Sequence, residues 1–206
     1  MRTNHSRSHR GTPRQALTPL LLAAGLTAAL AAGTAPAAQA TTQATTQAAA
    51  RTADNGVRLV FVKNHEHPDR STLSVRVGGE TIASYRAGSG LGASAEGRDS
   101  CRTNKGWLPN GTYRIEGHER HRDRTIKGFA IALADKKCSD GTLRSDLFIH
   151  SEMRADGNQG TTEATRWDGD SDYRSYGCIK LNPDHIKALF TKLDDRGWPA
   201  TLEVSG

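Results

Sequence analysis

Ser175-Tyr176-Gly177-Cys178-Ile179-Lys180-Leu181 is the stretch around which this chain is organised, because a cysteine follows a flexible glycine there and opens a short apolar run. A helix is predicted directly after it, since Asn182 is a good N-cap and Pro183 suits the first helical position. One face of that helix carries four apolar residues, Ile186, Leu189, Phe190 and Leu193. Gly197 ends the helix. A thiol in this place is presented by the backbone rather than by a mobile side chain.

A histidine stands at the end of an earlier apolar strand, Asp146-Leu147-Phe148-Ile149-His150-Ser151. A cysteine and an imidazole on neighbouring strand ends can form a nucleophile and base pair, because the imidazole draws off the thiol proton. We therefore predict that Cys178 is a nucleophile and that His150 is its base.

The rest of the chain is typical of a mainly β protein. Residues 72–77 and 80–85 flank Gly78-Gly79 as a hairpin. Further strands are predicted over residues 57–63, 112–117, 129–133, 147–149 and 200–204, which gives about seven strands and one firm helix. The mixed-charge run 118–124 is predicted to be a solvated hairpin tip.

The order His150-Ser151, then Ser175-x-Gly177-Cys178-Ile179-Lys180-Leu181, resembles the catalytic signature of the L,D-transpeptidases, the YkuD-like family of bacterial peptidoglycan enzymes. The stretch Lys105-Gly106-Trp107-Leu108-Pro109-Asn110-Gly111-Thr112-Tyr113-Arg114-Ile115 is similar to the Pro-x-Gly turn and strand of that family. The resemblance covers roughly the last three quarters of the chain. It implies the fold of the family's catalytic domain, which is mainly β, with mixed β-sheets and one helix in the C-terminal half.

The resemblance also implies catalytic roles. Cys178 attacks the substrate, His150 takes the thiol proton and later protonates the leaving amine, and the carbonyl of Ser151 orients the imidazole. The backbone amides of Gly177 and Cys178 form the oxyanion hole, where one donor is worth ~3–4 kcal/mol.

Three neighbouring residues are predicted to serve the substrate. Lys180 stands where the family has a basic residue and is expected to hold a substrate carboxylate, while Ser175 shapes the turn. Tyr176 occupies a position where the family often has histidine. Its phenol can donate a hydrogen bond but cannot act as a second base near neutral pH. We expect the fundamental acyl-transfer step to be kept.

The reaction implied by the resemblance cuts the bond between a diamino acid and the terminal D-Ala of a stem tetrapeptide, through a Cys thioester. An amine acceptor then gives a cross-link, water gives trimming, and a wall protein's lysine gives anchoring. Peptidoglycan stem peptides are the expected partners and carbapenem β-lactams the expected covalent inhibitors. We expect a monomer that needs no cofactor or metal.

Three cysteines are an odd number for an exported protein. If Cys101 and Cys138 pair, Cys178 stays free, as a nucleophile requires. Three free thiols are the alternative, and a bridge to Cys178 would silence the site. We favour the Cys101–Cys138 bridge.

The segment between His150 and Cys178 has 27 residues, which is longer than is usual in the family. We interpret residues 151–174 as a lid or substrate loop. Asp168, Asp170 and Asp172 have a spacing that hints at calcium, but the glycine and the closing acid of an EF-hand are missing.

Residues 1–40 are predicted to be a secretory signal peptide, since basic residues precede an apolar stretch and Ala38-Gln39-Ala40 fits a cleavage site. Residues 41–55 are predicted to be a disordered linker and residues 56–206 the catalytic domain. The first 40 residues hold four of the 28 basic residues and no acidic ones, so the remainder has 24 basic residues against 22 acidic. That balance does not favour nucleic-acid binding. The expected location is extracytoplasmic, secreted to the cell envelope.

Two other function classes stay open from the sequence. Cys101 with His118 or His121 has the cysteine-before-histidine order of papain-like or amidase-type thiol peptidases. A noncatalytic wall-binding module is the third class, for which repeats or an aromatic-rich face are expected. The chain has few aromatic residues, 5% of its length.

Overall fold

The protein is described by a computed structural model over residues 56–206. The predicted signal peptide, residues 1–40, and the predicted linker, residues 41–55, lie outside the described residues. In the part that is described, no helix is both long and apolar enough to cross a membrane.

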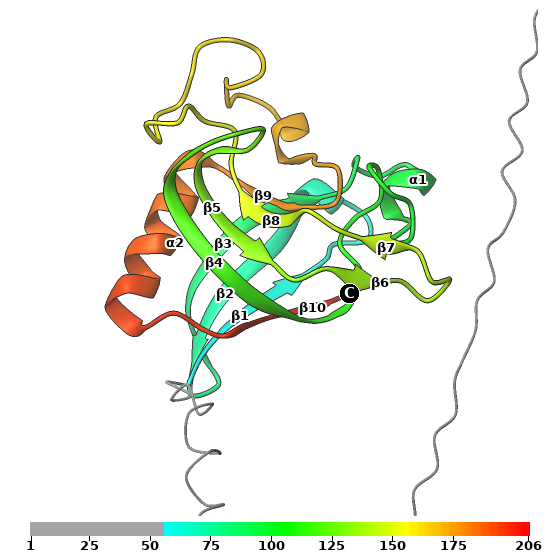
Figure 1. The fold of residues 1–206 in the computed structure, drawn as a ribbon, viewed down its shortest axis with the longest axis horizontal. Coiled ribbons are helices and arrows are strands. Elements are labelled where there is room, and N and C mark those ends of the chain that lie inside the picture. The colour runs from blue at the N-terminus through cyan, green and yellow to red at the C-terminus, as the bar shows by residue number, and fades with distance from the viewer. Residues whose placement is uncertain (1–55) are drawn as a thin grey trace, which may run out of the picture. The chain divides into compact units, whose positions relative to one another are not determined.

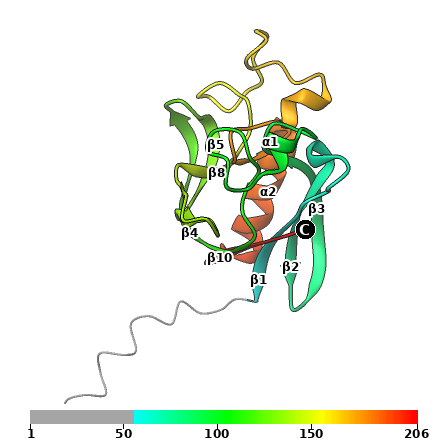
Figure 2. The same cartoon turned by 90° about the vertical axis from the view of Figure 1, so that its right-hand side faces the viewer.

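Eight strands form a closed barrel in the order β1-β10-β4-β5-β8-β9-β3-β2 (Figures 1 and 2). Their bounds are β1 Val57–Val62, β2 Ser71–Val77, β3 Glu80–Ser89, β4 Gly111–Asp123, β5 Lys127–Leu133, β8 Leu147–His150, β9 Ile179–Leu181 and β10 Thr201–Ser205. Two neighbouring pairs are parallel, β1 with β10 and β8 with β9, and the others are antiparallel. The mainly β fold predicted from the sequence is confirmed.

The remaining elements are short, apart from one helix. A separate two-stranded sheet joins β6 (Lys136–Lys137) to β7 (Leu143–Arg144). The helices are α1 (Ala95–Arg98) and α2 (Pro183–Arg196), with 3₁₀ turns η2 (Pro68–Arg70) and η3 (Asp170–Tyr173). Figure 1 shows α2 along one side of the barrel and the 151–174 segment beyond β8 and β9.

Helix α2 forms as its sequence predicts and buries its apolar face against the barrel. The side chain of Asn182 accepts a hydrogen bond from the Asp184 amide at 2.8 Å, and the helix ends at Gly197, whose φ is 97°. Its apolar face is buried in the main core with residues of the barrel interior. Since burying one such side chain stabilises by ~1.5–3 kcal/mol, this face fixes α2 and the strand before it.

The charged run 118–124 is mostly exposed and reaches the turn of the β4–β5 hairpin, as predicted, but it is strand rather than turn as far as Asp123. Strand β4 continues to Asp123 and pairs with β5 as far as Lys127. The run stays extended because its charges find partners on both sides. Arg120 binds Asp194 of α2, and the Arg122 guanidinium lies 4.8 Å from the centre of the Phe148 ring.

Candidate active site

The two predicted reactive residues lie on neighbouring strands. In the parallel pair β8–β9, Ile149 pairs with Ile179 and His150 pairs with Lys180. Both isoleucines are fully buried in the core. Because side chains alternate along a strand, His150, Lys180 and Cys178 project from the opposite face. Cys178 and His150 therefore share one face of adjacent strands, two residues apart in register.

His150 is buried and held by its neighbour in the chain. Its Nδ1 lies 3.0 Å from the carbonyl oxygen of Ser151, which is itself buried. This is the contact that the resemblance implies for Ser151. Burial lowers the pKa of His150 to about 4, although the Ser151 hydrogen bond raises it. The ring is therefore neutral at neutral pH, and with Nδ1–H donated to Ser151 its Nε2 lone pair is free to accept a proton.

Cys178 is a free thiol, 9% exposed, at the end of the turn before β9. Its Sγ lies 3.6 Å from the carbonyl oxygen of Asp146, to which the thiol donates. Burial raises its pKa to about 11, while a backbone hydrogen bond from Phe148 and the charge of Arg144 act in the opposite direction. Among residues 56–206, no hydrogen bond joins the Cys178 sulfur to the His150 ring. The resting pair is a neutral thiol beside a neutral imidazole.

The turn before Cys178 is shaped by Ser175, as the resemblance implies. Ser175 Oγ donates to the Cys178 carbonyl at 2.6 Å and accepts from the Gly177 amide at 3.4 Å. Gly177 has φ 117°, a conformation that disfavours any side chain, and a Cβ there would collide with Nη2 of Arg144. Tyr176 is 71% exposed, so its phenol is open to solvent beside the nucleophile.

Lys180 is not a free cation in this site. Its Nζ lies 2.7 Å from Glu152 Oε1, and its side chain is only 8% exposed. The ring of Trp167, from the 151–174 segment, lies 5.9 Å from the same Nζ. Sequence reasoning missed Glu152 and Trp167. Glu152 stands two positions beyond His150, a spacing that could have indicated a shared face.

The three aspartates with the calcium-like spacing, Asp168, Asp170 and Asp172, each have a protein partner. Asp170 binds Arg70 at 3.0 Å and Arg86 at 2.5 Å, which ties η3 to η2 and β3. Asp172 accepts from the backbone amides of Asp168 and Gly169, and Asp168 also pairs with Arg166 at 2.8 Å. The aspartates therefore anchor the segment itself.

A surface hollow of about 420 Å³ lies over β2 and β3, and Cys178 is not among the residues that line it. It is lined by Arg70, Ser71, Thr72, Ser84, Tyr85 and Arg86. Both arginines already share Asp170. The chemistry of the free thiol, rather than the size of this hollow, therefore identifies the candidate active site.

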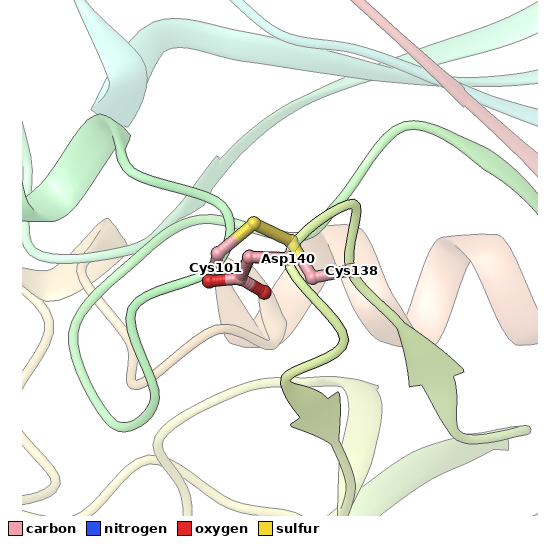
Figure 3. A group of neighbouring side chains, drawn as sticks. All are labelled: Cys101, Cys138 and Asp140. Carbon is pink, nitrogen blue, oxygen red and sulfur yellow. A yellow bond between two sulfur atoms is a disulfide. The ribbon is translucent and has the colours of Figure 1, made fainter.

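Cys101 and Cys138 are joined by a disulfide, as Figure 3 shows, with Asp140 beside them. This is the pairing that the cysteine count favours, and it leaves no thiolate in this group to hold a metal. It also removes the thiol-peptidase alternative based on Cys101. His118, on β4, stacks on Trp198 with ring centroids 3.5 Å apart. Because Cys101 is in the disulfide, His118 has no free thiol there from which to take a proton.

Loss of this disulfide should lower stability. The double variant Cys101→Ser/Cys138→Ser is expected to lose ~2–4 kcal/mol of unfolding free energy, since the bridge closes a loop of 37 residues. Urea denaturation of the oxidised wild type, the reduced wild type and the variant measures the change. The reduced wild type and the variant should have the same lowered urea midpoint. An unchanged midpoint in the variant would mean that the bridge does not stabilise the fold.

The family model of the L,D-transpeptidase catalytic domain, named YkuD, matches residues 60–200. No curated protein matches the chain.

Solved structures with similar folds include three L,D-transpeptidases. L,D-transpeptidase 1 of Mycobacterium tuberculosis is 18% identical, with a TM-score of 0.38 over 73% of this chain and 63% of that one. The enzyme of Stackebrandtia nassauensis is 18% identical, with a TM-score of 0.44 over 75% and 57%. L,D-transpeptidase 3 of M. tuberculosis, in complex with a faropenem-derived adduct, is 15% identical, with a TM-score of 0.41 over 73% and 61%. This chain spans less than two thirds of each of these proteins.

Proposed function

The chain belongs to the family of L,D-transpeptidase catalytic domains, and from that membership we propose that it is a peptidoglycan transpeptidase with Cys178 as its nucleophile. The observation that carries this proposal is the placement of a free thiol and a neutral imidazole on one face of the neighbouring strands β8 and β9. A thiol and an acceptor nitrogen in that arrangement support acyl transfer.

The first half-reaction forms a thioester. Substrate binding turns the Cys178 sulfur from the Asp146 carbonyl towards His150, whose Nε2 takes the thiol proton. The sulfur attacks the carbonyl carbon between the diamino acid and the terminal D-Ala of a stem tetrapeptide. The C–N bond breaks, and His150 returns its proton to the nitrogen of the departing D-Ala.

The oxyanion formed in that attack is bound by backbone amides. Gly177 and Cys178 supply them, and the Ser175 hydroxyl fixes their turn through the Cys178 carbonyl; the Gly177 amide leaves its long 3.4 Å bond to Ser175 Oγ to donate to the oxyanion. One such donor contributes ~3–4 kcal/mol to transition-state stabilisation.

The second half-reaction decides the product. An amine of another stem attacks the thioester, the C–S bond breaks, and a cross-link forms with the thiol regenerated. Water in place of the amine trims the stem to a tripeptide. Trp167, whose ring lies 5.9 Å from the Lys180 Nζ, and the exposed Tyr176, two residues before Cys178, are the aromatic side chains that we expect the stem peptides to contact.

Lys180 takes part as one half of an ion pair. With its Nζ 2.7 Å from Glu152, it can receive a substrate carboxylate only by sharing or releasing that partner. The Glu152 carboxylate is 39% exposed and can hold an ammonium group of the substrate. The pair therefore suits a stem that carries both a carboxylate and an amine.

We also place the protein outside the cytoplasm. The pattern of residues 1–40 and the disulfide between Cys101 and Cys138 support export to an oxidising compartment.

The test supplies residues 41–206 with disaccharide-tetrapeptide stems and follows the products by mass spectrometry. Release of D-Ala together with a cross-linked dimer is the expected result, and release of D-Ala with tripeptide alone would redefine the enzyme as a carboxypeptidase. A wall protein added as acceptor tests anchoring in the same assay. Absence of D-Ala release and of a stem-derived adduct on Cys178 would overturn the proposal.

A further inference from the structure

Arg144, at the end of β7, is a buried arginine whose partners are all backbone carbonyls. It is 2% exposed. Its Nη1 donates to the carbonyls of Ser100 and Trp107, the latter at 3.3 Å, and its Nη2 donates to the carbonyl of Gly106 at 2.9 Å. These three acceptors lie in one loop, which the Cys101–Cys138 disulfide also holds. Arg144 therefore fixes this loop to the β6–β7 sheet.

The guanidinium has no anionic partner in the resting protein. Within residues 56–206, no carboxylate lies within ion-pair distance of Arg144, whereas Lys180 is neutralised by Glu152. A buried cation without a counter-ion is costly, and burial accordingly lowers the pKa of Arg144. Tyr113 and Asp99, on β4 and in the 99–107 loop, act in the opposite direction.

The charge lies against the backbone that presents the nucleophile. A Cβ on Gly177 would collide with Nη2 of Arg144, so the guanidinium fills the space beneath the residue before Cys178. The attraction is mutual, since Arg144 lowers the pKa of the Cys178 thiol and negative charge on that sulfur raises the pKa of Arg144. The other charged groups near the sulfur are Asp146, which opposes the thiolate, and Lys180, which favours it.

We propose that Arg144 is a positioning residue that acts on the reaction through Cys178, by supplying the buried positive charge for which the Cys178 thiolate is the counter-ion. The same side chain packs against Gly177 and so fixes the position of the turn whose amides form the oxyanion hole. This inference rests on the proposed role of Cys178 as the nucleophile. It explains why the protein keeps an unpaired cation at 2% exposure next to its free thiol.

Two substitutions separate charge from packing. Arg144→Gln keeps amide donors for the carbonyls but removes the charge, and Arg144→Lys keeps the charge with fewer donors. The control is Arg58→Gln, an exposed arginine on β1 whose partner is Glu203. Each protein is alkylated with iodoacetamide between about pH 6 and pH 10, the label on Cys178 is followed by mass spectrometry, and thermal unfolding establishes that the protein is folded.

At about pH 8 we expect Arg144→Gln to be alkylated about tenfold more slowly than the wild type, with Arg144→Lys within about threefold of it and the control unchanged. The inference is overturned if folded Arg144→Gln reacts at the wild-type rate, or if both variants slow equally, which would make Arg144 a packing element only. If Arg144→Gln does not fold, the inference is tested on the wild type alone, by comparing alkylation with the anionic reagent iodoacetate and with neutral iodoacetamide. Its ratio of iodoacetate to iodoacetamide rates should exceed that of the urea-unfolded chain, and an equal or lower ratio overturns the inference.

This readout does not use stem peptides. A wild type without D-Ala release but with the expected alkylation differences would remove the proposed function and leave the role of Arg144 in place. A wild type that releases D-Ala but lacks the expected alkylation differences would remove only the role of Arg144.

Discussion

Cys178→Ala is expected to lower D-Ala release from stem tetrapeptides by at least about a thousandfold, because no thioester can form without the sulfur. The described part of the chain offers no substitute, since Cys101 and Cys138 are consumed by their disulfide. Loss of one buried sulfur atom leaves the barrel strands untouched. Thermal unfolding of the variant should therefore stay near that of the wild type, and D-Ala is quantified by mass spectrometry.

The same variant tests the expected inhibition by carbapenems. Opening of the β-lactam ring by Cys178 should add one inhibitor mass to the wild type and none to Cys178→Ala. The matched control is Cys101→Ser/Cys138→Ser, which should still form the adduct at temperatures below its unfolding transition. An adduct of wild-type yield on Cys178→Ala would show that another residue reacts.

The elements next to the nucleophile could be predicted because their signals are local. Asn182 caps α2 as its sequence indicates, and His150 contacts the carbonyl of the residue that follows it. The apolar runs on either side of the site are strands, as expected. Cys178 and His150 lie on one face because β8 and β9 are parallel neighbours, as was expected from the two short apolar strands that end in His150 and follow Cys178.

The features that the sequence did not predict depend on distant contacts. The carbonyls that bind Arg144 lie 37 to 44 residues away, and backbone acceptors have no side-chain pattern to reveal them. The pairing of Lys180 with Glu152 competes with the carboxylate role expected for Lys180. Strand β4 extends through a charged run because Arg120 pairs with Asp194 and Arg122 packs over the Phe148 ring. Local charge patterning alone favoured a turn there.

A buried, protonated thiol suits the oxidising compartment that we propose for this protein. The thiolate is the form that oxidises and exchanges with disulfides, and a pKa of about 11 keeps Cys178 almost entirely protonated near neutral pH. Cys101 and Cys138 are protected from oxidation by pairing with each other. The cost of this protection is that the thiol needs a base at the moment of reaction.

His150→Gln is expected to lower the rate of Cys178 acylation by about 10²- to 10⁴-fold at neutral pH, because the amide can still donate to Ser151 but cannot accept a proton. Single-turnover acylation by a carbapenem, followed by intact mass, measures this rate without the second half-reaction. The control is His67→Gln, an exposed histidine in the loop after β1, which should react like the wild type.

The pH dependence gives the stronger test of His150. Its pKa of about 4 and the Cys178 pKa of about 11 leave both groups neutral between those values. With His150 as base, the wild-type rate should therefore be nearly constant from about pH 5 to about pH 9. In His150→Gln only the thiolate reacts, so the rate should rise about tenfold for each pH unit, and the deficit should shrink towards pH 11. Parallel profiles for the two proteins would show that His150 does not take the thiol proton.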